Sequence, residues 1–284
     1  MKLSIGAFSF NNLRLEGKMN IFSYIETVHE RFNLQALDLW NAYFANISRP
    51  LWQVADDATL FRIRDALKER EMTVVNLAVD TAHVWDPDPE VREALHQNAL
   101  TYLRAAELIG AQSVRIDAVQ HGDGVLSEEA LEYIAARYRE YAARGQEGGY
   151  WVGPENHTGF SVQPEAIARI STAVDHPSYG VLLHMGRWAS KVPSVSRKPQ
   201  LPTEDEMAAG DEHVARWARH THIDWRTLEA ENAGARLHGL AQQGYDGYWA
   251  VEHHAPSGQL EAVEEALRRL RAHGAHAASL SAAL

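Results

Sequence analysis

Four side chains of the kind that bind metal ions stand at the ends of short apolar runs in the second half of the chain. They are Glu155, His184, His222 and Glu252, and they lie 29, 38 and 30 residues apart. Each interval is about one strand-plus-helix unit, so successive parallel strands would bring all four to one end of a sheet. Two carboxylates and two imidazoles that meet there would bind a divalent cation.

The strands that must position these residues can be read from the apolar pattern. We expect eight: Leu3–Phe8, Gln35–Leu39, Thr73–Val79, Ser113–Asp117, Tyr150–Glu155, Tyr179–His184, Arg219–Ile223 and Tyr248–Glu252. Amphipathic stretches between and after them predict helices. These are Asp56–Arg70, Glu90–Ile109, Ser127–Ala143, Pro164–Val174, Glu204–Trp217 and Leu260–Ala272. Eight such alternations predict a parallel sheet that can close into a (β/α)8 TIM barrel.

We expect one domain over residues 1–284, with a frayed Ala- and Ser-rich tail from Gly274. An open doubly wound sheet is the alternative fold. Its nucleotide-binding form lacks support, because no glycine-rich phosphate turn opens a helix here. A chain of 284 residues is within the usual size of a single barrel.

Composition excludes several classes of protein and of site. The chain has no cysteine, so neither a disulfide framework nor a thiolate metal site is available. Its net charge of -11 argues against a nucleic-acid partner. Neither a signal peptide nor a membrane-spanning apolar run is apparent, which predicts a cytoplasmic protein with no membrane partner. A homo-oligomer stays open.

Three segments resemble the xylose isomerase-like TIM barrels of the sugar phosphate isomerase/epimerase superfamily. They are Glu155-Asn156-His157, the run that ends in His222, and Gly244-Tyr245-Asp246-Gly247-Tyr248 leading to Glu252. The resemblance extends over nearly the whole chain. It implies one metal ion, often manganese, held by Glu, Asp, His and Glu at the ends of strands five to eight. It also implies that Glu155 and Glu252 act as the acid–base pair on a carbohydrate substrate.

The sixth expected strand departs from the family pattern. His184 stands where the family has an Asp, and Arg187 stands where it has a His that contacts substrate. An imidazole in place of a carboxylate removes one negative charge and favours Zn²⁺, Co²⁺, Fe²⁺ or Mn²⁺ over Mg²⁺. The alternative is that His184 is displaced and the metal binds weakly or not at all.

Other polar and aromatic residues are expected near the same end of the barrel. The predicted substrate contacts are His157, Arg187, Trp40, Asn76, Trp188 and Trp225. His220 lies one pleat deeper than His222, which predicts a supporting or core position. Asp38 and Asp117 are either core carboxylates paired with Arg115 or substrate contacts.

Two loops carry further candidates. His83 and His121 are substrate contacts or ordinary loop residues; the zinc cluster of related DNA-repair endonucleases would need ligands that this chain lacks. The segment Gly186–Pro202 is long and carries Arg187, Lys191, Arg197 and Lys198. It is either a lid over an anionic or polyhydroxylated ligand or a solvated loop.

The predicted charges define a type of reaction. A cation that touches two adjacent oxygens of a keto sugar acidifies the neighbouring C–H and stabilises an enediolate. Return of the proton to the neighbouring carbon gives an isomerase, and return to the opposite face gives an epimerase. Loss of a β leaving group would instead give a lyase on a 3-keto sugar or keto-inositol. A non-catalytic sugar- or metal-binding barrel is the remaining alternative.

Overall fold

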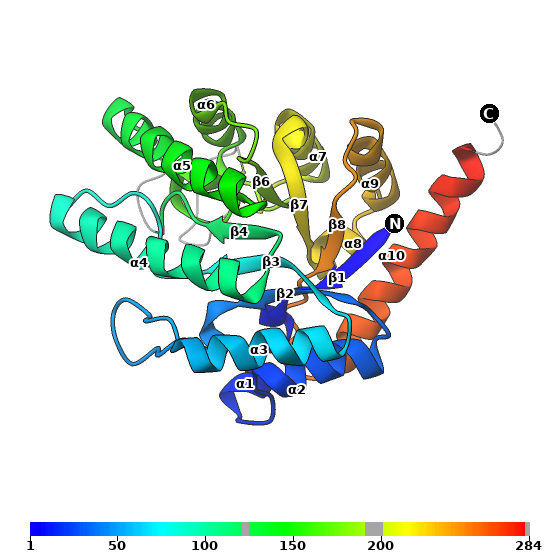
Figure 1. Ribbon diagram of the computed structural model, residues 1–284. Coiled ribbons are helices and arrows are strands. Elements are labelled where there is room, and N and C mark those ends of the chain that lie inside the picture. Colours follow the sequence, from blue (N-terminus) through cyan, green and yellow to red (C-terminus); the bar gives the residue numbers. More distant parts are fainter. Residues whose placement is uncertain (121–124, 191–200, 282–284) are drawn as a thin grey trace.

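The computed structural model describes residues 1–120, 125–190 and 201–281, in which eight strands alternate with helices (Figure 1). The strands are β1 (Lys2–Ile5), β2 (Ala36–Trp40), β3 (Thr73–Val79), β4 (Ser113–Ile116), β5 (Trp151–Gly153), β6 (Val181–His184), β7 (Ala218–Ile223) and β8 (Tyr248–Val251). The longer helices are α3 (Asp57–Glu69), α4 (Pro89–Ile109), α5 (Glu128–Gly148), α6 (Pro164–Val174), α7 (Glu204–Val214), α9 (Ala233–Gln242) and α10 (Gln259–Ser281). Three short helices are α1 (Asn11–Leu15), α2 (Ile21–Glu26) and α8 (Trp225–Glu229).

All strand pairs are parallel, and they form two four-stranded sheets. One has the order β2-β3-β4-β5 and the other the order β1-β8-β7-β6. Isolated bridges link the two sheets at both seams: Gly6 pairs with Asp38, and Val152 pairs with Tyr179. Consecutive strands are thus neighbours all the way round, and the predicted TIM barrel fold is confirmed.

Glycines make the β5–β6 seam narrow. A Cβ atom on Gly153 would overlap the carbonyl oxygen of Gly180, so the two backbones approach in a way that only glycine allows. The amide of Gly180 donates to the carbonyl of Val152 across this seam at 3.2 Å. The seam matters for function because the candidate ligands Glu155 and His184 lie just beyond it.

Four strands, β1, β4, β5 and β8, end earlier than predicted on the side that faces the site, whereas β2 runs one residue longer, to Trp40. β1 ends at Ile5, because Ala7–Phe10 forms a 3₁₀ turn. β5 ends at Gly153, since the next residue, Pro154, has no N–H for the sheet. Glu155 therefore stands just past its strand, held by an isolated bridge to Leu182.

The helices bury the faces that the periodicity predicted. In α3, Leu60, Ile63 and Leu67 are all buried, and the side chain of Asp56 caps the helix by accepting from the amide of Thr59. At the other end of the chain, α10 continues to Ser281, past Gly274, where the sequence predicted a frayed tail. α2 and α9 are helices that the sequence reading did not delimit.

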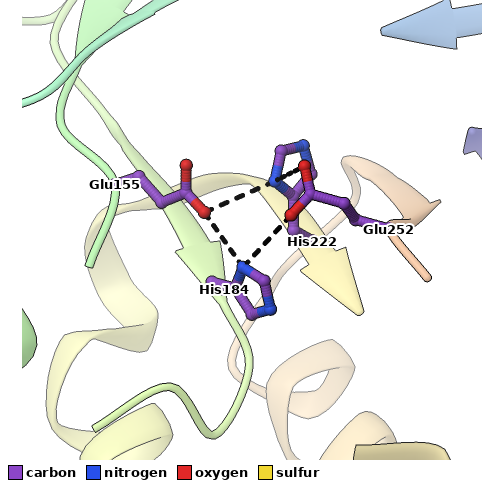
Figure 2. A group of neighbouring side chains, drawn as sticks. All are labelled: Glu155, His184, His222 and Glu252. Carbon is purple, nitrogen blue, oxygen red and sulfur yellow. Dashed lines mark hydrogen bonds and ion pairs between the residues drawn. The ribbon is translucent and has the colours of Figure 1, made fainter. Parts of the chain in front are cut away.

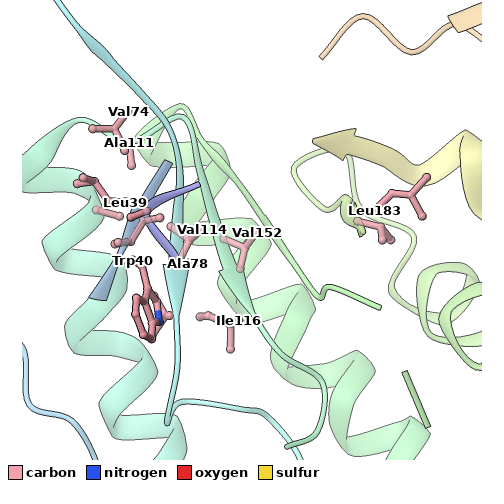
Figure 3. Close-up of a cluster of buried hydrophobic side chains, with 14 of the residues drawn as sticks. Leu39, Trp40, Val74, Ala78, Ala111, Val114, Ile116, Val152 and Leu183 are labelled. Carbon is pink, nitrogen blue, oxygen red and sulfur yellow. The ribbon is translucent and has the colours of Figure 1, made fainter. Parts of the chain in front are cut away.

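Apolar side chains fill the space between the strands and the helices around them. Figure 3 shows part of this cluster, in which Leu39 of β2, Val114 of β4 and Val152 of β5 are fully buried. Such packing makes the barrel a rigid frame for side chains at its mouth. In the part of the chain that the structure describes, no helix is both long and apolar enough to cross a membrane.

Candidate metal centre

The four predicted ligands come together at the mouth of the barrel (Figure 2). Glu155 follows β5, His184 ends β6, His222 lies in β7, and Glu252 follows β8. One ligand atom from each lies within 4.8 Å of the others. The first three side chains are almost completely buried, whereas the side chain of Glu252 keeps 12% of its surface exposed. Glu252 is thus the carboxylate with more access to solvent.

Both imidazoles turn the same ring atom toward the carboxylates. Nδ1 of His184 lies 2.9 Å from Oε1 of Glu155 and 3.6 Å from Oε2 of Glu252. Nδ1 of His222 lies 3.4 Å from Oε1 of Glu155 and 3.4 Å from Oε1 of Glu252. The four donors therefore converge on one small volume, as a coordination sphere requires.

The other ring nitrogen of each histidine faces a buried carboxylate. Nε2 of His222 lies 3.1 Å from Oδ2 of Asp38, and Nε2 of His184 lies 3.9 Å from Oδ2 of Asp224. A hydrogen-bonded carboxylate behind an imidazole fixes the tautomer and strengthens the ring as a ligand, as Asp38 does for His222. Nε2 of His184 has no hydrogen-bond partner among the described residues. Nδ1 of His222 is buried and has no hydrogen-bond partner among the described residues, so this ring atom is left to face the centre. This arrangement fits a divalent cation.

Electrostatics indicate what the four residues do without a cation. Burial opposes ionisation of Glu252, but His222 and a hydrogen bond with His254 hold the pKa of its carboxyl far below the ordinary value. Burial likewise opposes ionisation of Glu155, and His157 and His222 outweigh it to lower that pKa. Burial would lower the pKa of His222, but Glu252 and Glu155 raise it well above its ordinary value. A proton on His222 thus supplies positive charge between the two carboxylates, as a bound cation would.

Asp38 is the centre of a second buried cluster behind the ligands. Its Oδ2 accepts from Nε2 of His220 at 2.6 Å and from His222, and its Oδ1 accepts from the hydroxyl of Ser4 at 2.9 Å. Burial raises the pKa of Asp38, but the two imidazoles outweigh it and bring the pKa to about 2. His220 therefore supports His222 through Asp38, in the deeper position predicted for it. Asp38 pairs with histidines and not with Arg115.

We expect Asp38→Asn to weaken metal binding about 10–100-fold while the barrel stays folded, because an amide no longer stabilises the His222 ring by charge. Calorimetric titration with Mn²⁺ would measure the change, and thermal melting would check the fold. Asp57→Asn is the matched control, since Asp57 pairs with Arg104 on the surface. An unchanged Mn²⁺ affinity in Asp38→Asn would mean that Asp38 does not contribute to metal binding.

A buried arginine borders the centre on the β4 side. Nε of Arg115 lies 3.2 Å from Oε2 of Glu155, and its Nη1 contacts Asp80 at 2.9 Å and Asp117 at 3.1 Å. Asp117 also accepts from Nδ1 of His157 at 2.8 Å. Arg115 thus fixes one oxygen of Glu155 and leaves the other facing the imidazoles. The sequence predicted the pairing of Arg115 with Asp117 as one of two alternatives, but it did not predict the contact with Glu155.

A cavity of about 230 Å³ opens over the centre. Phe8 and Trp40 form an aromatic wall, with ring centroids 5.0 Å apart, and the ring of His254 also packs against Phe8. The polar part of the lining comprises Asp38, Asp80, Arg115, Glu155, His157, Arg187, His222 and Glu252. Sequence reasoning assigned no specific role to Phe8, Asp80 or His254, although all three lie just beyond strand ends.

The predicted substrate contacts divide into two groups. Trp40, His157 and Arg187 line the cavity. The other three do not. Asn76 is fully buried and its amide faces Asp38, Trp188 is buried with its indole N–H on Asp211, and Trp225 is 44% exposed at the start of α8.

The remaining loop candidates lie apart from the centre. His83 borders a smaller neighbouring pocket that also contains Asp117 and His157. His121 and the basic residues Lys191, Arg197 and Lys198 lie outside the described residues, so the proposed lid stays a prediction.

A substitution at β6 tests the departure from the family pattern. His184→Asp would replace a nitrogen ligand by an oxygen ligand and add one negative charge. We expect the preference to move toward harder cations, with a rise in the ratio of Mg²⁺ or Mn²⁺ affinity to Zn²⁺ affinity. Competition titrations with the three ions would measure it. An unchanged ratio would mean that His184 does not touch the metal.

Comparisons with known proteins agree with the fold. A family model described as xylose isomerase-like TIM barrel matches residues 42–273. A search of curated proteins finds no match. Similar solved structures include 3-keto-D-glucoside 4-epimerase YcjR from E. coli in its apo form, with 14% identity, 96% of this chain and 99% of that chain covered, and a TM-score of 0.68.

Two further similar structures differ in their described chemistry. One is the probable 3-DHS dehydratase AsbF of petrobactin synthesis from Bacillus anthracis, with 13% identity, 94% and 99% coverage, and a TM-score of 0.65. The other is a xylose isomerase-like TIM barrel protein from Mycobacterium smegmatis in complex with magnesium, with 15% identity, 96% and 97% coverage, and a TM-score of 0.65. At these identities the likeness shows the fold alone.

Proposed function

This chain belongs to the xylose isomerase-like TIM barrel family, and we propose that it is a divalent-metal-dependent isomerase or epimerase of a keto sugar or related polyol. One observation carries the proposal. The buried carboxylate of Glu155 and the partly exposed carboxylate of Glu252 share one centre with two imidazoles, and Glu155, His222 and Glu252 line the cavity above it. Proton abstraction next to a carbonyl needs such a pair of bases beside an electrophile.

The metal is proposed to be Mn²⁺, with Zn²⁺, Co²⁺ or Fe²⁺ as alternatives that a mixed nitrogen and oxygen donor set also accepts. Glu155, His184, His222 and Glu252 would hold it. When bound, a divalent cation polarises the substrate carbonyl and lowers the pKa of the adjacent C–H. The magnesium complex of a similar barrel protein supports a metal-dependent activity without identifying the ion used here.

The two carboxylates have different surroundings, which suggests how they share the proton transfers. Oε2 of Glu155 is held by Arg115 at 3.2 Å, so this carboxylate is fixed in place. Oε2 of Glu252 lies 3.2 Å from Nε2 of His254, whose ring is 33% exposed. A proton taken up by Glu252 therefore has a route toward solvent through His254. Glu155 would act on the opposite side of the substrate, and the apolar edge-to-face pair of Phe8 and Trp40 suits the C–H groups of a sugar.

A lyase is the second candidate. If the substrate carries a leaving group β to its carbonyl, the same carbanion expels that group instead of regaining a proton. The similar 3-DHS dehydratase supports this alternative, whereas the similar 3-keto-D-glucoside 4-epimerase supports the first.

Turnover in heavy water tests the proposed function. Incubation of the Mn²⁺-loaded protein with a panel of keto sugars should place deuterium at the carbon next to the carbonyl, detected by NMR. Release of water or of an aglycone would identify the lyase. Turnover with no solvent exchange would indicate a hydride shift and contradict the proposed enediolate intermediate. If no substrate in a broad panel turns over and the sugars still bind, the protein is a binding barrel.

A further inference from the structure

Arg187 is a cavity-lining cation whose charge no described residue neutralises. The residue follows β6, is half-buried and lines the cavity above the metal centre. Its Nε donates to the carbonyl of His157 at 3.2 Å. Among residues 1–120, 125–190 and 201–281, neither Nη atom has a hydrogen-bond partner and no carboxylate forms an ion pair with it. In a chain with a net charge of -11, such a guanidinium requires an explanation.

The position of Arg187 is fixed before any ligand arrives. Its amide donates to the carbonyl of His184 at 3.1 Å, and its carbonyl accepts from Nδ2 of Asn156 at 3.1 Å. The hydrogen bond from Nε to the carbonyl of His157 then fixes the side chain as far as the guanidinium group. Three hydrogen bonds thus hold the backbone and Nε while the terminal nitrogens stay available, which is the arrangement expected of a recognition residue.

The turn before Arg187 is fixed as well. Gly186 adopts a left-handed conformation with φ of 73°, and its amide donates to Oδ1 of Asp211 at 2.9 Å. A Cβ atom there would come within 2.6 Å of Nη2 of Arg236. Only glycine can make this turn without strain, so the chain leaves β6 in one direction. Trp188 is buried against Asp211, and Arg187 is the residue left facing the cavity.

Arg115 provides an internal comparison. It lines the same cavity, but Asp80, Asp117 and Glu155 surround it with three carboxylates, so its charge is more than balanced. Arg187 has no carboxylate partner among the residues that the structure describes. The two arginines therefore differ in function: Arg115 holds protein carboxylates, whereas Arg187 is free to hold one that the ligand brings.

We propose that the substrate of this site carries a carboxylate, which the two Nη groups of Arg187 bind while the sugar carbons extend over the metal centre toward Phe8 and Trp40. This inference rests on the proposed function and narrows its substrate to acidic keto sugars. A planar guanidinium fork matches the two oxygens of one carboxylate. A phosphate dianion would call for more donors than the two Nη groups of Arg187 provide.

Binding of two matched polyols tests the inference without any need for turnover. D-Gluconate and D-glucitol differ at one carbon, where a carboxylate replaces a hydroxymethyl group. Calorimetric titration of the Mn²⁺-loaded protein should give about 10–100-fold tighter binding of D-gluconate, the range expected for charge-assisted hydrogen bonds. Arg187→Gln should abolish this preference and leave D-glucitol binding within about twofold, whereas Arg187→Lys should keep part of it.

Arg216→Gln is the matched control, because Arg216 packs on Trp217 outside the cavity and should leave both affinities unchanged. A D-gluconate preference that persists in Arg187→Gln would place the carboxylate on the metal and overturn the inference. Equal binding of the two polyols by the unchanged protein would overturn it too. Stronger, Arg187-dependent binding of D-glucitol 6-phosphate would replace the carboxylate by a phosphate.

Failure of this inference and failure of the proposed function give different results. If neutral keto sugars turn over and the matching keto sugar acids turn over no better, in the unchanged protein or in Arg187→Gln, the enzyme stands and the acidic substrate does not. If D-gluconate binds through Arg187 but no keto sugar acid exchanges its proton with heavy water, the acidic ligand stands and the catalytic proposal does not.

Discussion

Glu252→Gln should remain folded and bind Mn²⁺ more weakly, and it should lose about 10²–10⁴ in kcat, the usual contribution of a positioned general acid or base. A glutamine amide keeps the size of the side chain but cannot accept the substrate proton. The loss should persist at saturating Mn²⁺, because it comes from proton transfer and not only from the missing ligand charge. Steady-state kinetics over a Mn²⁺ series would separate the two effects.

Glu155→Gln should lower kcat by a similar factor and should also destabilise the surrounding structure. The change removes one of three carboxylates that surround Arg115, so we expect a fall in thermal stability that Glu252→Gln does not share. Glu69→Gln is the control for both, because that side chain is 78% exposed and remote from the cavity. If Glu252→Gln keeps kcat within tenfold of the unchanged protein, Glu252 is not the base.

The positions of the four ligands could be predicted because the rule that places them is topological. In a parallel barrel every strand ends at the same face, so residue type and spacing alone bring Glu155, His184, His222 and Glu252 together. In the structure one donor atom of each lies within 4.8 Å of the others. Whether they bind a metal stays a prediction. The same rule predicted that Trp40 and Arg187 would lie at the mouth.

Other contacts could not be predicted, because they depend on register and rotamer across the barrel. Asp38 and His222 are 184 residues apart in the sequence. They meet only because both side chains point into the barrel at the same height along its axis. The contact between Arg115 and Glu155 depends on where β5 ends, which Pro154 sets. The left-handed turn at Gly186 directs Trp188 away from the cavity and onto Asp211. The sequence shows only that Trp188 follows a strand end, and this does not fix the direction of its side chain.

Metal binding should become stronger as pH rises, because a proton and the cation compete for His222. Without metal, Glu252 and Glu155 raise the pKa of His222 well above its ordinary value despite its burial. Below that raised pKa the cation must displace one proton from Nδ1, so the apparent affinity should rise about tenfold per pH unit. Above it the affinity should level off. The direction of this pH dependence follows from the raised pKa of His222, because the protonated imidazole is favoured without metal and metal binding removes its proton.

Calorimetry in buffers with different heats of ionisation would count the protons released when Mn²⁺ binds near neutral pH, and we expect about one. His222→Ala is the informative variant: it should bind Mn²⁺ more weakly, and its affinity should depend much less on pH. His29→Ala is the control, because His29 is paired with Glu30 on the surface, far from the barrel mouth in sequence and in the fold. A Mn²⁺ affinity that does not change between about pH 5.5 and 7.5 would mean that the cation does not use Nδ1 of His222, since an imidazole near its ordinary pKa would already titrate in that range.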